Sequence, residues 1–176
     1  MGDEILYFEE QSRKPWWLLL ILIIVDVLMI YGCIQQLILG QPWGNNPVGD
    51  GVLVALTIFV LALTVIFFFV KLKTWICKEG IYMRYFPLVL KTKFFDWDSI
   101  DSIYVRQYSP VKEYGGWGYR FGLGKSVAFN VSGNVGLQLI LKNGKRVLIG
   151  TRKPDEINDV LLALGIKTGK EQSNPE

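Results

Sequence analysis

Histidine is absent from the 176 residues of this sequence, and only two cysteines are present. Without histidine, the chain lacks the commonest general base near neutral pH and the commonest ligand of transition metals. Most hydrolase mechanisms and zinc sites lose their main residue in this way, and we expect neither a metal nor a cofactor. The two cysteines, Cys33 and Cys77, are too few to form a disulfide framework.

Charge is nearly missing from two long stretches. The only charged residue of positions 16–39 is Asp26, and residues 52–70 carry none. Each stretch matches the ~20 apolar residues needed to cross a ~30 Å hydrocarbon layer. The first is too long for the apolar part of a signal peptide, and no small-residue cleavage site follows it. We predict two transmembrane helices, at residues 16–39 and 51–72.

Lysine and arginine are missing from the connection between these stretches, GQPWGNNPVGDG. Arg13 and Lys14 precede the first stretch, and Lys71 and Lys73 follow the second. The positive-inside rule then places both termini in the cytoplasm of a multi-pass protein of the cell membrane. Thiols stay reduced there, so we expect no disulfide at Cys77.

Positive charge is concentrated in the C-terminal part, where residues 71–176 carry seventeen Lys or Arg against ten acids. Such a basic body is attracted to a leaflet that holds anionic lipids. The alternative is an ordinary solvated surface that follows the positive-inside rule. No recognised nucleic-acid-binding module accompanies the charge, so we expect the lipid bilayer, and no nucleic acid, as a partner.

The pattern after the second stretch is typical of an all-β domain, because short apolar and aromatic segments alternate with Gly, Pro, Asn and Asp. We predict antiparallel strands at KTWIC, IYMRYF, KFFDW, IDSIYVRQ, GYRFG, SVAFNVS, VGLQLILK and RVLIG. A helix should follow from Pro154, with apolar residues at i, i+3, i+4 and i+7 from Ile157. We expect residues 1–15 to be a cytoplasmic lead and residues 167–176 a disordered tail.

Seven or eight short strands followed by one helix is the element order of the pleckstrin-homology-like (PH-like) fold. The segments FEEQSRKPWW, FDWDSIDSIYVRQYSP, EYGGWGYR, AFNVSGNVGLQL and NGKRVLIGTRKPDE resemble motifs of an uncharacterised family of bacterial membrane proteins. The resemblance covers nearly the whole chain. It implies a two-helix membrane hairpin, a mainly-β PH-like split barrel at residues 73–166 capped by a C-terminal helix, and a bacterial inner-membrane location. It implies no established activity.

Side chains in a strand at WGYRFG alternate between two faces. The alternation predicts one core-facing row, Trp117, Tyr119 and Phe121. Arg120 then points to the other side. An antiparallel pairing of Arg120 with Ala128 or Asn130 would place the apolar residues of both strands in the core.

The opposite side would present Arg120, Asn130 and Ser132 over a floor of small residues, where the guanidinium could meet a flat anionic partner. The structural alternative is that Arg120 pairs internally with Glu113 or Asp101, and that the nearby glycines relieve a bend or bulge. Our hypothesis is a partner or ligand surface formed by Trp117, Arg120, Asn130 and Ser132.

Asp26 falls near the middle of the first apolar stretch, where an acid is costly and by default suggests a function. With the centre of the hairpin near residue 45, Thr64 should lie at the same depth. A hydrogen bond from a protonated Asp26 to Thr64 would satisfy the acid. We expect Asp26 and Thr64 to form an intramembrane contact, either within the hairpin or to another copy; a proton relay is the alternative.

No catalytic set is evident in the sequence. Asp96, Asp98 and Asp101 lie close together, but their spacing matches no metal-binding loop. We expect no enzyme activity. The sequence favours a membrane-anchored interaction module that contacts a protein partner or a lipid head group, with homo-oligomerisation through the helices possible. The alternative is an accessory subunit of a transport or catalytic membrane complex.

Overall fold

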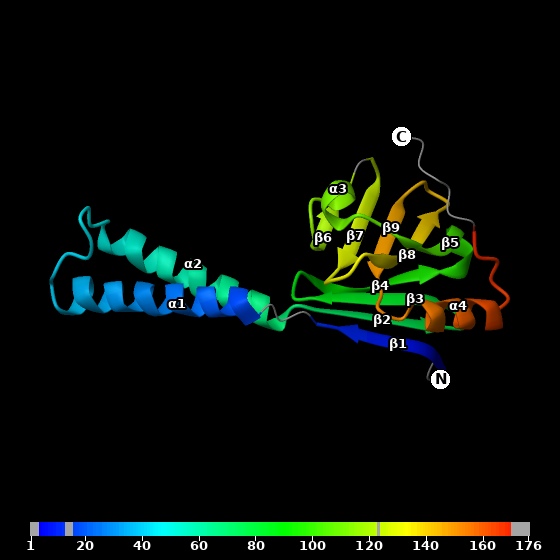
Figure 1. The fold of residues 1–176 in the computed structure, drawn as a ribbon, viewed down its shortest axis with the longest axis horizontal. Helices are drawn as coiled ribbons and strands as arrows, with labels where there is room; N and C mark the ends of the chain where they lie inside the picture. Colours follow the sequence, from blue (N-terminus) through cyan, green and yellow to red (C-terminus); the bar gives the residue numbers. More distant parts are fainter. Residues whose placement is uncertain (1–3, 13–15, 123, 170–176) are drawn as a thin grey trace. The chain divides into compact units, whose positions relative to one another are not determined.

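A computed structural model describes residues 4–12, 16–122 and 124–169. The chain forms two compact units. One is helical and comprises Lys14–Phe69, and the other is a β unit that comprises Met1–Arg13 together with Val70–Glu176 (Figure 1). The β unit is therefore discontinuous in sequence, with the helical unit inserted after its first strand.

The helical unit contains α1 (Trp16–Cys33), which continues as a short π-helix, η1 (Ile34–Ile38), and α2 (Asp50–Phe69). Both helical segments are long and apolar enough to cross a membrane, and most of their side chains are exposed within the unit. The prediction that the second segment reaches residue 72 is wrong at that end. Leu72 is fully buried in the core of the β unit and belongs to a strand.

The connection between the helices folds back on η1. The ring of Trp43 packs against Gly32 so closely that a Cβ on this glycine would lie 2.6 Å from the indole. Gln36 donates its side-chain amide to the Val48 carbonyl and to the Asp50 carboxylate, both at 2.7 Å. The connection is thereby attached to both helices without a charged pair.

The first sheet of the β unit has the strand order β1–β2–β3–β4 and is antiparallel throughout. Its strands are β1 (Ile5–Gln11), β2 (Lys71–Cys77), β3 (Gly80–Phe86) and β4 (Val89–Asp96). The prediction that residues 1–15 form a separate lead is therefore wrong for β1. This strand, blue in Figure 1, pairs along its length with β2, the strand that follows α2.

The second sheet has the strand order β5–β8–β9–β7–β6. Its strands are β5 (Ile100–Gln107), β6 (Gly118–Phe121), β7 (Ser126–Asn130), β8 (Val135–Leu141) and β9 (Arg146–Gly150). β9 lies between β8 and β7 and runs parallel to β7, which corrects the expectation of a wholly antiparallel arrangement. The described part of the chain thus has nine strands in two sheets, and they do not form a closed barrel.

The core lies between the two sheets. Leu72, Ile81 and Met83 of the first sheet pack with Leu137 and Ile149 of the second. A C-terminal helix, α4 (Pro154–Ala163), adds Ile157 and Leu161 to the same core, as its apolar periodicity predicts. The short helices η2 (Trp97–Ser99) and α3 (Pro110–Tyr114) complete the unit.

The predicted disordered tail is only partly described. Residues 167–169 have a defined place, because the Gly169 amide donates to the Ile103 carbonyl at 2.9 Å. Residues 170–176 of the predicted tail lie outside the described ranges.

A buried carboxylate connects β1 to the end of β9. The Glu9 carboxylate accepts hydrogen bonds from the Tyr7 hydroxyl at 2.6 Å, the Thr151 hydroxyl at 2.8 Å and the Arg152 amide at 2.9 Å. Gln11, two residues further on, donates to the Gly150 carbonyl at 2.6 Å. These bonds satisfy polar groups that would otherwise be costly to bury, and they fix β1 in the unit.

Candidate interaction surface and its polar support

The segment EYGGWGYRFG makes a tight corner at the edge of the second sheet. Pro110 occupies the first turn of α3, and Gly115 ends this helix with a left-handed backbone, φ 69°. The Gly115 amide donates to the Val111 carbonyl and the Gly116 amide donates to the Pro110 carbonyl. These bonds close the helix, as glycines at helix C-termini commonly do. The chain then enters β6.

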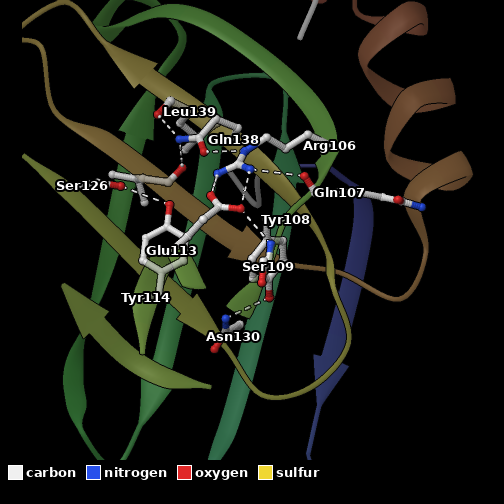
Figure 2. Close-up of polar contacts among 11 residues, drawn as sticks. Arg106, Gln107, Tyr108, Ser109, Glu113, Tyr114, Ser126, Asn130, Gln138 and Leu139 are labelled. Carbon is white, nitrogen blue, oxygen red and sulfur yellow. Dashed lines mark hydrogen bonds and ion pairs between the residues drawn. The ribbon is translucent and has the colours of Figure 1, made fainter. Parts of the chain in front are cut away.

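A bidentate ion pair supports this corner (Figure 2). Arg106 on β5 donates to both oxygens of the Glu113 carboxylate, at 2.7 and 3.3 Å. Arg106 also donates from Nε to the Gln138 side-chain oxygen at 3.1 Å and from Nη1 to the Gln107 carbonyl at 3.2 Å. The Ser109 amide donates to Glu113 at 2.7 Å. Charge-assisted forks of this kind fix geometry as well as adding energy. The pair therefore attaches α3 to the sheet.

Glu113 has a lowered pKa in the folded protein: burial opposes the shift, but the hydrogen bonds from Arg106 and the Ser109 amide outweigh it. A carboxyl group whose pKa is lowered by folding stabilises the folded state at pH values above its ordinary pKa of 4.5. This stabilisation is lost as the pH falls through the folded-state pKa. We expect Glu113→Gln to lower the free energy of unfolding by about 1–2 kcal/mol at pH 7.

Urea unfolding of the β unit between pH 3 and pH 7 measures this effect. The free energy of unfolding of Glu113→Gln should fall less steeply between pH 7 and pH 3 than that of the wild type. Glu156→Gln, which removes an exposed ion pair to Lys153, serves as the control and should follow the wild-type profile. If the free energy of unfolding fell equally steeply with pH in the wild type and in Glu113→Gln, the Glu113 carboxylate would not be stabilising the fold.

Of the predicted surface residues, Arg120 has the expected register and is exposed. It lies opposite Ala128 on β7, and its Nε donates to the Trp117 carbonyl at 3.1 Å. The alternative is that Arg120 pairs with Glu113 or Asp101. Arg106 pairs with the Glu113 carboxylate instead, and among the described residues Arg120 forms no ion pair with Asp101.

The apolar row of β6 only partly faces the core. Tyr119 stacks on Phe129 at 4.9 Å, as expected. Phe121 is 70 % exposed, because β6 is an edge strand and this residue lies at its end. Trp117 is 40 % exposed, and its indole donates to the Gly133 carbonyl at 2.8 Å.

Asn130 does not contribute to an open surface, which corrects the hypothesis for this residue. It is fully buried, its side-chain amide donates to the Tyr108 hydroxyl at 2.8 Å, and its side-chain oxygen accepts from the Gly118 amide at 2.7 Å. The expected floor of small residues is covered, since the ring of Tyr114 on α3 lies directly over Gly122. The sequence analysis did not identify α3; a proline after Ser109 was its only clear signal.

Ser132 contacts Arg152, a residue that the sequence analysis did not identify. The Arg152 guanidinium donates to the Ser132 hydroxyl at 2.7 and 3.2 Å. Ser132 adjoins Gly133, which holds the Trp117 indole. We define the Trp117–Arg120 surface as Trp117, Arg120, Ser132 and Arg152. It presents two exposed guanidinium groups beside an indole.

Tyr85 lies beneath this surface and joins the two sheets. Its hydroxyl donates to the Asn130 carbonyl at 3.2 Å. Burial raises the pKa of Tyr85 to about 12, with the charge of Arg120 acting in the opposite direction. The phenol is therefore neutral at physiological pH, and the support of the Trp117–Arg120 surface does not titrate there.

In the helical unit, the structure brings Asp26 and Thr64 together, with their oxygens 2.7 Å apart. The Thr64 hydroxyl is also 3.1 Å from the Val60 carbonyl and has one hydrogen to share between these two acceptors. The other oxygen of Asp26 is buried and has no hydrogen-bond partner among the described residues. Two turns of helix further along α1, Cys33 contacts Thr57 at 3.2 Å.

In the part of the chain that the structure describes, no three Cys, Asp or Glu side chains form a group that could hold a metal ion. Asp96, one of the three clustered acids, instead accepts from the Asp98 amide at the start of η2.

Fold and surface together define a protein with two helices apolar enough to span a membrane and a β unit of two packed sheets closed by a C-terminal helix. The chain belongs to a family of unknown function, DUF6141, whose model matches residues 3–166. The match includes β1, both helices and α4. No curated protein and no solved structure matches the chain.

Proposed function

We propose that the chain is a non-enzymatic membrane-anchored module of the bacterial inner membrane. In this proposal α1 and α2 cross the membrane, both termini are cytoplasmic, and the β unit contacts a protein partner or a lipid head group. The exposed apolar helices support the anchor. The distribution of Lys and Arg around them supports the orientation.

The proposal includes a PH-like identity for the β unit. Two packed sheets with a C-terminal helix on the shared core support it. Two features would make this β unit a variant of the PH-like fold. The strand β1 precedes the two helices in the sequence, and β7 pairs in parallel with β9.

The Trp117–Arg120 surface is the observation that carries the proposed contact. Arg120 bonds the Trp117 backbone, the Trp117 indole bonds Gly133, and the neighbouring Ser132 bonds Arg152. Indole and guanidinium groups are among the side chains that dominate binding energy at protein interfaces. They also suit recognition of carboxylates and phosphates.

Crosslinking and mass spectrometry in native membranes tests this surface. We expect Arg120→Ala to reduce the yield of partner crosslinked to the β unit by about fivefold or more, as loss of an interface arginine commonly does. Arg146→Ala removes another exposed arginine of the same sheet and is the matched control. Equal yields from Arg120→Ala and the control, with the fold intact, would contradict the proposal.

The second candidate function is an accessory subunit of a transport or catalytic membrane complex. The buried Asp26 oxygen without a hydrogen-bond partner among the described residues favours it, since a donor from another subunit or a second copy would satisfy that oxygen. In this case Asp26→Asn should release the chain from a larger assembly while insertion is retained.

A further inference from the structure

Four aromatic residues form a continuous row across the first sheet. Phe8 on β1 lies opposite Trp75 on β2, Trp75 opposite Tyr82 on β3, and Tyr82 opposite Phe94 on β4. The Trp75 and Tyr82 rings stack at 5.5 Å, and the Tyr82 and Phe94 rings at 4.4 Å. We call these four residues the aromatic row.

The aromatic row lies on the face of the sheet that points away from the core. Its sequence neighbours Ile76, Ile81 and Phe95 pack in or against the core, whereas the row does not. Phe8 is 50 % exposed and Phe94 is 46 % exposed. Stacking across strands stabilises the sheet and accounts for the contacts between the rings, but it does not account for the exposure of Phe8 and Phe94 at the two ends of the row.

Further apolar and basic side chains extend this face. Leu88 and Leu90, at the turn into β4, are exposed. Arg84 is exposed next to the row and lies 5.8 Å from the Phe86 ring. Apolar surface bordered by cations is complementary to the boundary between acyl chains and anionic head groups.

Basic residues gather at the end of β2 that follows α2. Lys71 and Lys73 both pair with Glu10, at 2.6 and 2.8 Å, and their hydrogen bonds lower the pKa of Glu10 to about 2. One carboxylate thus serves two lysines, and together with Arg84 these cations outnumber the exposed carboxylates of Glu10 and Asp96 on the same face. The face keeps a net positive charge around an apolar centre.

Two strands of this sheet are those joined most directly along the chain to the helices. Gln11, the last residue of β1, lies five residues before Trp16, and Lys71 lies two residues after Phe69. No other strand is connected as directly to the helices.

We propose that the aromatic row and the basic residues beside it form a docking face for the interfacial region of an anionic phospholipid bilayer. Tryptophan and tyrosine concentrate at this depth because their rings are apolar with one polar end. The inference rests on the proposed membrane anchor. It assigns the lipid contact to the first sheet, so the Trp117–Arg120 surface of the second sheet stays available to a protein partner.

Site-specific photocrosslinking of the full chain tests this face in nanodiscs of phosphatidylcholine and phosphatidylglycerol. A benzophenone side chain replaces Phe8, Phe94 or, as the matched control, Phe121, which is more exposed but lies on the second sheet. A fourth variant places it at Ile23, an exposed residue of α1, to report on the anchor. Adducts are identified by mass spectrometry.

We expect lipid adducts at positions 8, 94 and 23, each at least about fivefold above position 121. Lipid adducts at 23 without adducts at 8 and 94 would overturn the docking face and leave the anchor intact. Absence of lipid adducts at 23 would overturn the anchor itself. Crosslinks from 8 or 94 to a second copy of the chain would show a protein interface and overturn the lipid assignment.

Quenching of tryptophan fluorescence by brominated lipid provides a second measurement that keeps the row nearly intact. Trp75→Phe keeps an aromatic ring at this position. The decrease in lipid quenching of this variant relative to the wild type therefore reports the quenching of Trp75. Trp117→Phe is the control. We expect the loss of quenching to be larger for Trp75→Phe, and an equal or smaller loss would overturn the proposal.

Discussion

Replacing Glu9 by alanine is expected to lower the free energy of unfolding of the β unit by roughly 2–4 kcal/mol. The change removes an acceptor that serves the Tyr7 hydroxyl, the Thr151 hydroxyl and the Arg152 amide. Each of these buried or half-buried donors then loses a partner, and each unsatisfied donor costs more than a typical hydrogen bond contributes. Urea unfolding of the full chain in nanodiscs measures the loss.

The adjacent residue offers a matched control. Glu10→Ala removes a carboxylate of the same size, but its two ion pairs are exposed, and such pairs contribute about 0–1 kcal/mol. Hydrogen exchange in β1 should therefore accelerate strongly in Glu9→Ala and little in Glu10→Ala. If both variants lost the same stability, the buried bonds of Glu9 would not be what holds β1.

Asn130→Ala is expected to destabilise the β unit by roughly 2–3 kcal/mol, because it leaves the Gly118 amide and the Tyr108 hydroxyl without their side-chain partner. The Gly118 bond fixes the start of β6. We therefore also expect faster hydrogen exchange over β6 than elsewhere in the second sheet.

Ser132→Ala is the control for Asn130→Ala. It removes only the acceptor of the exposed Arg152 side chain, so we expect a change within about 0.5 kcal/mol. A stable Asn130→Ala protein with unchanged exchange in β6 would mean that this amide is dispensable for folding. It would restore the hypothesis that Asn130 acts on a ligand.

The alternating strands of the β unit could be predicted from sequence because one face of each is apolar. β5 and β9 have the predicted bounds, and the register of Arg120 with Ala128 follows from the same alternation. β1 could not be found in this way. Its inward-facing residues include Glu9 and Gln11, which are buried only because residues 150–152 supply hydrogen-bond partners.

The candidate surface was predicted only in part for a related reason. Alternation in β6 and β7 separates Arg120 and Asn130 from the core row, but it cannot show what covers that side. α3 has five residues, too few for a periodic pattern, yet its Tyr114 packs with Tyr108 over Ala128. Asn130 is structural because its side chain bonds Tyr108 and the Gly118 amide, whereas Arg120 remains exposed.

The pairing of β1 with β2 sets a condition on how the chain is made. Some sixty residues, including both apolar helices, separate these partners, so β1 must wait until α2 has been synthesised before it can pair. If the helices insert into a bilayer, pairing is possible only after an even number of crossings. A chain inserted through a single helix would leave β1 and β2 in opposite compartments. Glu9 would then lack its Thr151 and Arg152 donors, and the first sheet could not be completed.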